Sequence, residues 1–427
     1  MFSLPRSRIG LPQFDALARA LGYLKQVPLG FALGLIAMQA AIISFDSLAA
    51  NCLGCYGNDW IETPNWDRLA ATGAVFDRHF AETIGPLAGM AWADGQQAHS
   101  PQDGLATIPV GSRLKSNGIA TRFITAVEER SWQRGAEFDQ TQTVHGRDGF
   151  DAQPDEIPFA QVVKAGLSEW SDASFQQRPR LLWLHSPGPG RPPKGFDSLY
   201  FEDFEERGEK IAELSNEERS EHPAVYAGAV SLLDHWLGEL LTGIESHTEP
   251  MLIVVMAAQG YRWHRIRSSK IKETNRSERL LDDQLIRTPL LLNVIGDDRF
   301  KDIGSLRSDR LVQTCDLIPT LIDWFELTSA SDEQSPGGQS WLRELTEEAV
   351  PRQSLHIGDK AGFDAIRTVD WLCIRDNTRK SEADAPTPPN PSVSLFAKPE
   401  DIWDVDDIAS QQPEIVGELL GRIPHDR

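Results

Sequence analysis

The chain has 427 residues, of which 40% are hydrophobic, and its 63 acidic and 42 basic side chains give a formal net charge of −21. This length suits one large α/β domain with an appended unit, and the hydrophobic content can build a sizeable core. The negative charge argues against nucleic acid and anionic membrane surfaces as partners, because their phosphates would be repelled.

The N-terminal region shows helical spacing followed by one apolar stretch. Residues 11–26 carry apolar positions at helical spacing, which predicts an extra helix. Residues 27–45 are apolar over nearly the length that crosses a bilayer, but Pro28 and Gln39 interrupt them. The last third of this stretch is better explained as a strand, so we expect a cytoplasmic protein. An export signal or membrane anchor within residues 27–45 is the alternative.

The first strand ends at a carboxylate. Residues 40–45 form an apolar, β-branched run typical of a buried strand, and Asp46 follows directly. Open α/β sheets bind ligands at this end of their strands, which makes Asp46 a candidate site residue. Thr63 and Pro64 then predict a helix start, with Thr63 capping free amides, and Gly73 predicts its end.

Further short strands alternate with amphipathic helices. Apolar runs predict strands at residues 120–126, 181–185 and 251–256, and residues 225–241 predict an amphipathic helix. This alternation is typical of an α/β fold with a mostly parallel sheet. His185 lies within the second of these strands, where we expect a half-buried histidine.

The C-terminal region predicts a smaller unit. Residues 365–374 and 395–405 are expected to be strands, residues 412–421 a closing helix, and residues 376–394 a Pro-rich loop. The predicted division is therefore an N-terminal extension (1–39), an α/β domain (40–345) and a C-terminal subdomain (346–427).

Two of the four cysteines, Cys52 and Cys55, form a C-x-x-C pair. No second pair or βαβ redox context accompanies it, so neither a zinc site nor a thioredoxin-like site is indicated. We expect Cys55 to pack against neighbouring side chains.

Several motifs occur in a familiar order. The runs LGCYG (residues 53–57), TPNWDRLA (63–70) and DLIPTLID (316–323) resemble the sulfatase family, within the alkaline-phosphatase-like superfamily. The resemblance extends from about residue 40 to the C-terminus. It implies a mostly parallel central sheet sandwiched by helices, followed by a small antiparallel sheet plus a helix. A shared fold does not by itself establish a shared function.

The family's nucleophile has no counterpart here. In sulfatases a C-x-P-S-R motif supplies a cysteine that becomes formylglycine, whose hydrate attacks the sulfate ester. The corresponding segment contains Gly85, Pro86 and Leu87, none of which can attack sulfur. Because no cysteine lies between Cys55 and Cys315, a formylglycine enzyme with a cysteine precursor is excluded.

The metal and sulfate contacts are also altered. The resemblance implies Ca²⁺ or Mg²⁺ held by several hard oxygen ligands, but Ala258 replaces a ligating carboxylate and Gln259 keeps only an amide oxygen. Asp46 alone is insufficient, so we expect no bound cofactor. The family's sulfate-contacting histidine aligns with Gly190.

Basic residues follow the altered metal motif, in a region where family members carry a sulfate-contacting lysine. These candidate anion-binding residues are Arg262, His264, Lys270 and Lys272. They are interpreted either as a basic loop that balances an acidic protein or as a site that binds an anion without turnover.

The sequence thus favours a sulfatase-family homologue that has lost catalysis and acts as a binding or regulatory pseudoenzyme. Its expected partner is a protein or a small anionic ligand. The alternative is an active sulfuric or phosphoric ester hydrolase with a displaced nucleophile. Thr83 is the nearest hydroxyl to the altered segment, but the sequence shows no base or metal to activate it.

Overall fold

The computed structural model describes a defined part of the chain. The described residues are 38–85, 88–93, 108–128, 131–176, 179–215, 218–219, 221–244, 249–262, 281–327, 338–346, 349–358, 362–376 and 392–423. The predicted helix at 11–26, most of the predicted loop at 376–394, and residues 27–37 of the membrane candidate lie outside these ranges.

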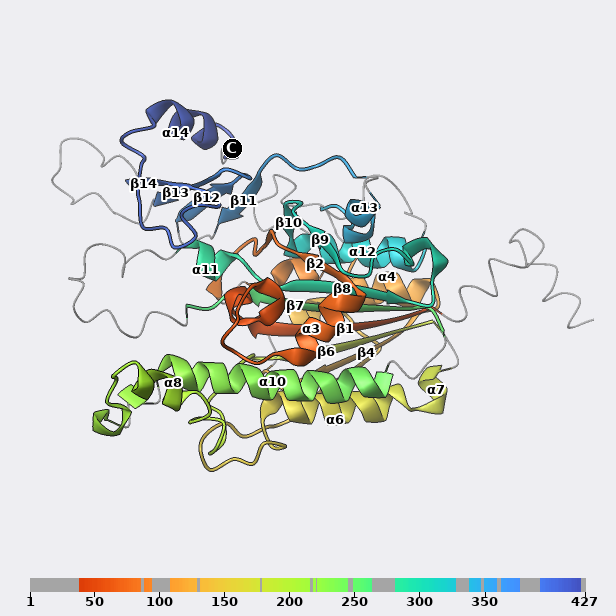
Figure 1. The fold of residues 1–427 in the computed structure, drawn as a ribbon. Helices are drawn as coiled ribbons and strands as arrows, with labels where there is room; N and C mark the ends of the chain where they lie inside the picture. Colours follow the sequence, from red (N-terminus) through yellow and green to blue (C-terminus); the bar gives the residue numbers. More distant parts are fainter. Residues whose placement is uncertain are drawn as a thin grey trace, which may run out of the picture.

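A mostly parallel sheet forms the centre of the described structure (Figure 1). Its spatial order is β5 (Gln140–Thr143), β4 (Ala120–Thr125), β6 (Arg180–Ser186), β1 (Gln39–Ser47), β7 (Met251–Gln259), β8 (Leu290–Ile295), β2 (Ala74–Phe76) and β9 (Leu306–Ser308). Strand β8 runs antiparallel to β7 and β2, and the other neighbours are parallel. The predicted fold class is confirmed.

Strand β1 is central because both of its faces are apolar. Ala41, Ile43 and Phe45 enter one core, whereas Ala40 and Ile42 enter the core on the opposite face. Since β1 is parallel to both β6 and β7, the C-terminal ends of the three strands meet at one edge of the sheet. Residues 39–45, the last part of the membrane candidate, therefore belong to a buried strand, as predicted.

Helices cover both faces of this sheet (Figure 1). One face packs against α3 (Pro64–Thr72), α6 (Pro158–Trp170) and α10 (Pro223–Ile244). The other packs against α4 (Val110–Ser116), α12 (Leu317–Trp324) and α13 (Trp341–Leu345). The short elements are β3 (His79–Phe80), α5 (Ser131–Gly135), α7 (Ala173–Gln176), α8 (Phe201–Glu206), α11 (Asp283–Ile286) and β10 (Val312–Gln313).

The start of α3 differs from its prediction in one detail. The Thr63 hydroxyl does not cap the helix, and instead accepts a hydrogen bond of 2.8 Å from the Gly54 amide. The free amides of Asn65 and Trp66 donate to the buried Asp234 carboxylate of α10, at 2.9 and 3.0 Å. The cap thus comes from another helix, which fixes α3 against α10.

The C-terminal unit is a four-stranded antiparallel sheet with one helix, as predicted. It comprises β11 (Leu355–Gly358), β12 (Phe363–Arg367), β13 (Trp371–Asp376), β14 (Ser392–Ala397) and α14 (Pro413–Leu420). The expected strand at 365–374 is wrong, because a turn after Arg367 divides it between β12 and β13. The expected strand at 395–405 ends at Ala397. The loop that follows is held by the Asp401 carboxylate, which accepts hydrogen bonds from the backbone amides of residues 405 and 406.

Within the described ranges, no helix combines the length and the apolar character that a membrane crossing requires.

Candidate functional site

Asp46 lies at the C-terminal end of β1 and contacts a histidine. Its carboxylate Oδ1 is 3.2 Å from Nε2 of His185, which comes from the neighbouring strand β6. The Asp46 side chain is 13% exposed and the His185 side chain is fully buried. The expectation of a half-buried strand histidine is therefore wrong, because the ring turns toward the end of β1 and is covered there.

Polar and aromatic side chains hold the His185 ring in place. Its Nδ1 is 2.9 Å from the Ser44 hydroxyl, and the Trp183 indole donates to the same hydroxyl at 2.8 Å. Phe123 stacks on the ring with centroids 6.2 Å apart, and Trp92 meets it edge-on at 6.1 Å. This arrangement fixes both the position and the orientation of the imidazole.

The altered metal motif at the end of β7 lies beside β1. Ala258 is 1% exposed and packs in the same core as Ala40 and Ile42 of β1, while Ser47 lies opposite Gln259. The Gln259 side-chain oxygen accepts a 2.7 Å hydrogen bond from the Gly85 amide. The residues that the resemblance aligns with the metal motif and with the start of the nucleophile segment are therefore in contact, whereas Pro86 and Leu87 lie outside the described residues.

Thr83, the alternative nucleophile, is 3% exposed. Its hydroxyl has no hydrogen-bond partner in the part of the chain that the structure describes. A buried hydroxyl without a base beside it is a weak nucleophile.

Gly190, in the loop after β6, lies against the carboxylate of Asp148, which comes from the segment between β5 and α6. A Cβ atom on Gly190 would lie 2.6 Å from both carboxylate oxygens of Asp148. Burial raises the pKa of Asp148 above its ordinary value. An acidic group here would repel a sulfate ester when ionised, whereas a histidine would attract it.

Of the four predicted anion-binding residues, Arg262 lies within the described ranges. The Arg262 guanidinium forms an ion pair with Asp282, and both side chains are largely buried. Asp282 also caps α11 by accepting from the Leu285 amide at 3.1 Å. The charge of Arg262 is thus compensated by an acidic neighbour, and His264, Lys270 and Lys272 lie outside the described residues.

A small cavity of about 70 Å³ lies beside this edge of the sheet. It is lined by Ala50, Asn51, Asp283, Gln284, Arg287, Ile402 and Trp403. Ligand pockets ordinarily exceed ~300 Å³, so this cavity is too small for a sulfated sugar. Sequence reasoning missed it because its walls come from three segments that are far apart along the chain.

Comparison with known proteins establishes the family. Residues 41–327 match the sulfatase family model. The chain belongs to the sulfatase family. No curated protein matches it.

Solved sulfatase-fold structures resemble nearly the whole chain. A protein in complex with its substrate D-glucosamine-2-N,6-O-disulfate has a TM-score of 0.65 and 14% identity, covering 90% of this chain and 96% of its own. A 2-O GAG sulfatase has a TM-score of 0.64 and 15% sequence identity, and the match covers 90% of each chain. The phosphonate monoester hydrolase of Agrobacterium radiobacter has a TM-score of 0.62 and 14% sequence identity. The match covers 90% of this chain and 94% of the hydrolase. At these identities the likeness shows the fold alone.

The described residues do not fit the divalent cation of the sulfatase family. Ca²⁺ takes six to eight oxygen ligands and Mg²⁺ demands near-ideal octahedral geometry. Here Asp46 is engaged by His185, the Gln259 oxygen by Gly85, and Ala258 offers no side-chain ligand. The described ranges also contain no cluster of three or more His, Cys, Asp or Glu side chains suited to a metal.

Proposed function

We propose that this sulfatase-family protein is catalytically silent and acts as a binding or regulatory protein. One contact carries the proposal. The residues that the family resemblance aligns with the nucleophile segment and with a metal ligand are joined in this chain by a hydrogen bond from the Gly85 amide to the Gln259 side chain. Neither group can attack sulfur, and the amide uses one of the two lone pairs of the Gln259 oxygen that a metal would need.

The changes at the other positions support the same proposal. Ester cleavage in this family needs a nucleophile, a cation and positive groups around the sulfate. Ala258 has no side-chain oxygen to bind a cation. Gly190 has no positive side chain to bind a sulfate, and the neighbouring Asp148 adds an acidic group beside it. These residues belong to separate segments, so no single substitution accounts for the altered site.

A hydrolase with a displaced nucleophile is the second candidate. The observation in its favour is the Thr83 hydroxyl, which lies two residues from Gly85 and has no hydrogen-bond partner within the described ranges. Its 3% exposure opposes this role, because an ester has to reach the attacking oxygen.

Turnover assays test the proposal. We expect no hydrolysis of p-nitrophenyl sulfate, p-nitrophenyl phosphate or a phenylphosphonate monoester, with Ca²⁺, Mg²⁺ or Mn²⁺ present or absent. Asp46→Ala and Thr83→Val are the control variants. Turnover that survives repurification and is lost in Asp46→Ala would overturn the proposal, and loss in Thr83→Val would support the displaced nucleophile.

Calorimetric titration with inorganic sulfate distinguishes the two expected partner classes. Saturable heat supports a small anionic ligand, and its absence at millimolar sulfate supports a protein partner.

A further inference from the structure

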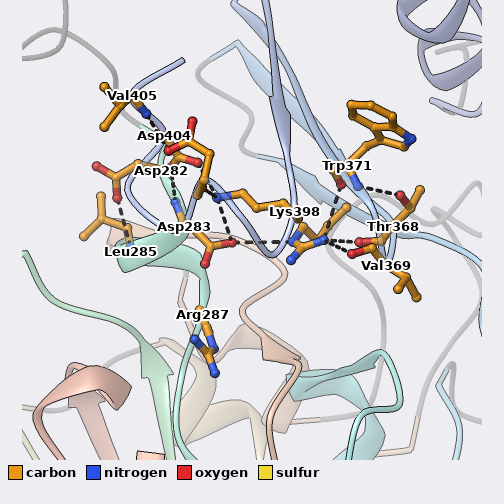
Figure 2. Close-up of polar contacts among 12 residues, drawn as sticks. Asp282, Asp283, Leu285, Arg287, Thr368, Val369, Trp371, Lys398, Asp404 and Val405 are labelled. Carbon is orange, nitrogen blue, oxygen red and sulfur yellow. Dashed lines mark hydrogen bonds and ion pairs between the residues drawn. The ribbon is translucent and has the colours of Figure 1, made fainter. Parts of the chain in front are cut away.

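We propose that the loop after β14 (residues 399–407), named here the acidic loop, is a docking surface for a protein that presents a basic segment with apolar side chains. The loop belongs to the C-terminal unit, so the proposal goes beyond the function proposed for the strand-end site. Figure 2 shows part of this loop, at Asp404 and Val405, beside α11.

Exposed apolar side chains are concentrated in the acidic loop. Eight large hydrophobic side chains are exposed in the part of the chain that the structure describes, and three of them lie within residues 402–405. Ile402 is 45% exposed, Trp403 37% and Val405 63%. Single exposed apolar side chains are normal on a soluble protein, whereas a group of them marks an interaction site.

The remaining residue of this group points inward. Asp404 is 2% exposed, and its carboxylate accepts hydrogen bonds from the buried Lys398 ammonium and from the Asp283 amide of α11. Its φ of +53° lies in the left-handed region, which residues other than glycine adopt rarely. Burial of Asp404 thus fixes the loop, while Trp403 and Val405 on either side of it stay at the surface.

Polar contacts, and not the apolar side chains, give the loop its shape. The Asp401 carboxylate accepts from the amides of residues 405 and 406 at 2.9 Å each, and the Lys398 ammonium donates to the Asp401 carbonyl. Ile402 and Val405 are therefore held in place without being buried. A surface that is already ordered loses less conformational entropy when a partner binds.

The small cavity beside the loop offers a recess to such a partner. Ile402 and Trp403 line it together with Ala50 and Asn51, which follow β1. Its volume of about 70 Å³ has room for the end of one side chain. An apolar side chain that enters there would be shielded from water on most sides, and buried contacts of this kind supply most of the binding energy at interfaces.

The charge around the apolar side chains determines the class of partner. No lysine or arginine occurs between Lys398 and Arg422, and Lys398 is itself 3% exposed. The exposed charged residues of the loop are all acidic: Glu400, Asp406 and Asp407. This rim attracts lysine and arginine side chains and repels nucleic acid and anionic membranes.

Two basic side chains near the loop are engaged elsewhere. Arg287 lines the cavity, but its Nε donates to the Asp77 carbonyl at 3.0 Å. Arg262 forms an ion pair with Asp282 of α11. Neither cancels the negative charge that the acidic loop presents to a partner.

A model peptide of leucine and lysine at helical spacing tests the proposal by fluorescence anisotropy with the full-length protein. Because the surface is smaller than a standard interface, we expect a Kd of roughly 1–50 μM at about 50 mM NaCl, weakened at least about fivefold at about 300 mM. Peptides with glutamate for lysine, or with serine for leucine, should bind at least about tenfold more weakly. Equal binding of either peptide would overturn the proposal.

Variants of the loop locate the binding. Ile402→Ser combined with Val405→Ser should weaken peptide binding about tenfold and move the melting temperature by less than about 2 °C, because polar contacts hold the loop. Leu199→Ser is the matched control, since Leu199 is 52% exposed and precedes the acidic helix α8. Loss of binding in this control, or none in the double variant, would overturn the proposal.

Hydrogen exchange tests the same point without any substitution. Saturating peptide should protect amides of residues 399–407 in the wild type, and protection confined to other segments would overturn the proposal.

Two other occupants are distinguished by separate measurements. Self-association in sedimentation, abolished by Ile402→Ser with Val405→Ser, would assign the surface to a second copy of this chain. Cosedimentation with phosphatidylcholine vesicles, abolished by the same substitutions, would assign it to a membrane. Either result would overturn the proposal of a basic protein partner, and the absence of both would support it.

Discussion

Two glycines in the loop after β6 shape the strand-end site for different reasons. Gly188 has φ +107°, and a Cβ atom there would lie 2.2 Å from the backbone oxygen of Ser47. This oxygen belongs to β1 and cannot move without disturbing the sheet. At Gly190 the obstacle is the carboxylate of Asp148, the end of a side chain that can rotate. The loop can approach β1 only because residue 188 has no side chain.

The two positions should therefore respond differently to alanine. Gly188→Ala should lower the free energy of unfolding by about 2–4 kcal/mol, because it combines backbone strain with an immovable clash. Gly190→Ala, the matched control, should cost less than about 1 kcal/mol. Urea denaturation of both variants measures the difference, and equal losses would contradict this account.

At the scale of elements, the C-terminal sheet is joined to the main domain by a buried ionic cluster (Figure 2). The Lys398 ammonium is 2.6 Å from the Asp404 carboxylate and 3.9 Å from Asp283 of α11, and Arg367 of β12 reaches Asp283 at 3.5 Å. Asp404 also accepts from the Asp283 amide at 2.7 Å. Because α11 borders the small cavity, these contacts fix one wall of it.

This cluster should make stability depend on pH. Burial and then the neighbouring Asp283 raise the pKa of Asp404 from 3.8 to about 6. A carboxyl that binds its proton more tightly in the folded state contributes stability that is present in full below the unfolded pKa. That contribution is lost as the pH rises through about 6.

Between pH 5 and pH 7 the wild type should therefore lose about 1 kcal/mol through Asp404. Asp404→Asn should reduce that loss, whatever its effect on absolute stability. Asp370→Asn, which changes an exposed carboxylate in the same unit, should keep the wild-type slope. Denaturation at the two pH values compares the slopes, and an unchanged slope in Asp404→Asn would contradict the assignment.

At the scale of the whole molecule, local pattern was sufficient to predict the architecture but not the contacts within the site. The apolar runs of β1, β6 and β7 and the periodicity of α10 are properties of short segments, so they could be located in the sequence. The assignment of Ala258 and Gly190 to altered site positions stays a prediction from the alignment of the surrounding motifs. The contact between Asp46 and His185 could not be predicted, because it depends on which strands become neighbours and in which register.

The helix cap from Asp234 and the wall that Trp403 contributes to the small cavity were missed for the same reason, since each joins segments that only the tertiary fold brings together. Sequence signals of capping and turn formation describe near neighbours along the chain. They predicted the start of α3 correctly and its capping partner incorrectly.

Under the proposed function the altered residues are spread over several segments, so restoring one of them should not produce catalysis. Ala258→Asp would place a second carboxylate on the face of the sheet that holds Asp46. Like charges at one buried site repel, so the variant should melt several degrees lower than the wild type. Ca²⁺ or Mg²⁺ should recover part of this loss by binding only the folded variant.

Ala257→Asp is the matched control, because Ala257 faces the opposite core. The Ala257→Asp variant should be destabilised without any response to cations, since Asp46 lies on the opposite face of the sheet. Aryl-sulfate turnover should be absent in both variants, because a cation cannot supply a nucleophile and none of Gly85, Pro86 and Leu87 can act as one. Melting curves with and without cation, together with turnover assays, measure these outcomes. Hydrolysis by Ala258→Asp would show that the absence of one metal ligand alone prevents catalysis. It would contradict the view that several altered positions prevent it together.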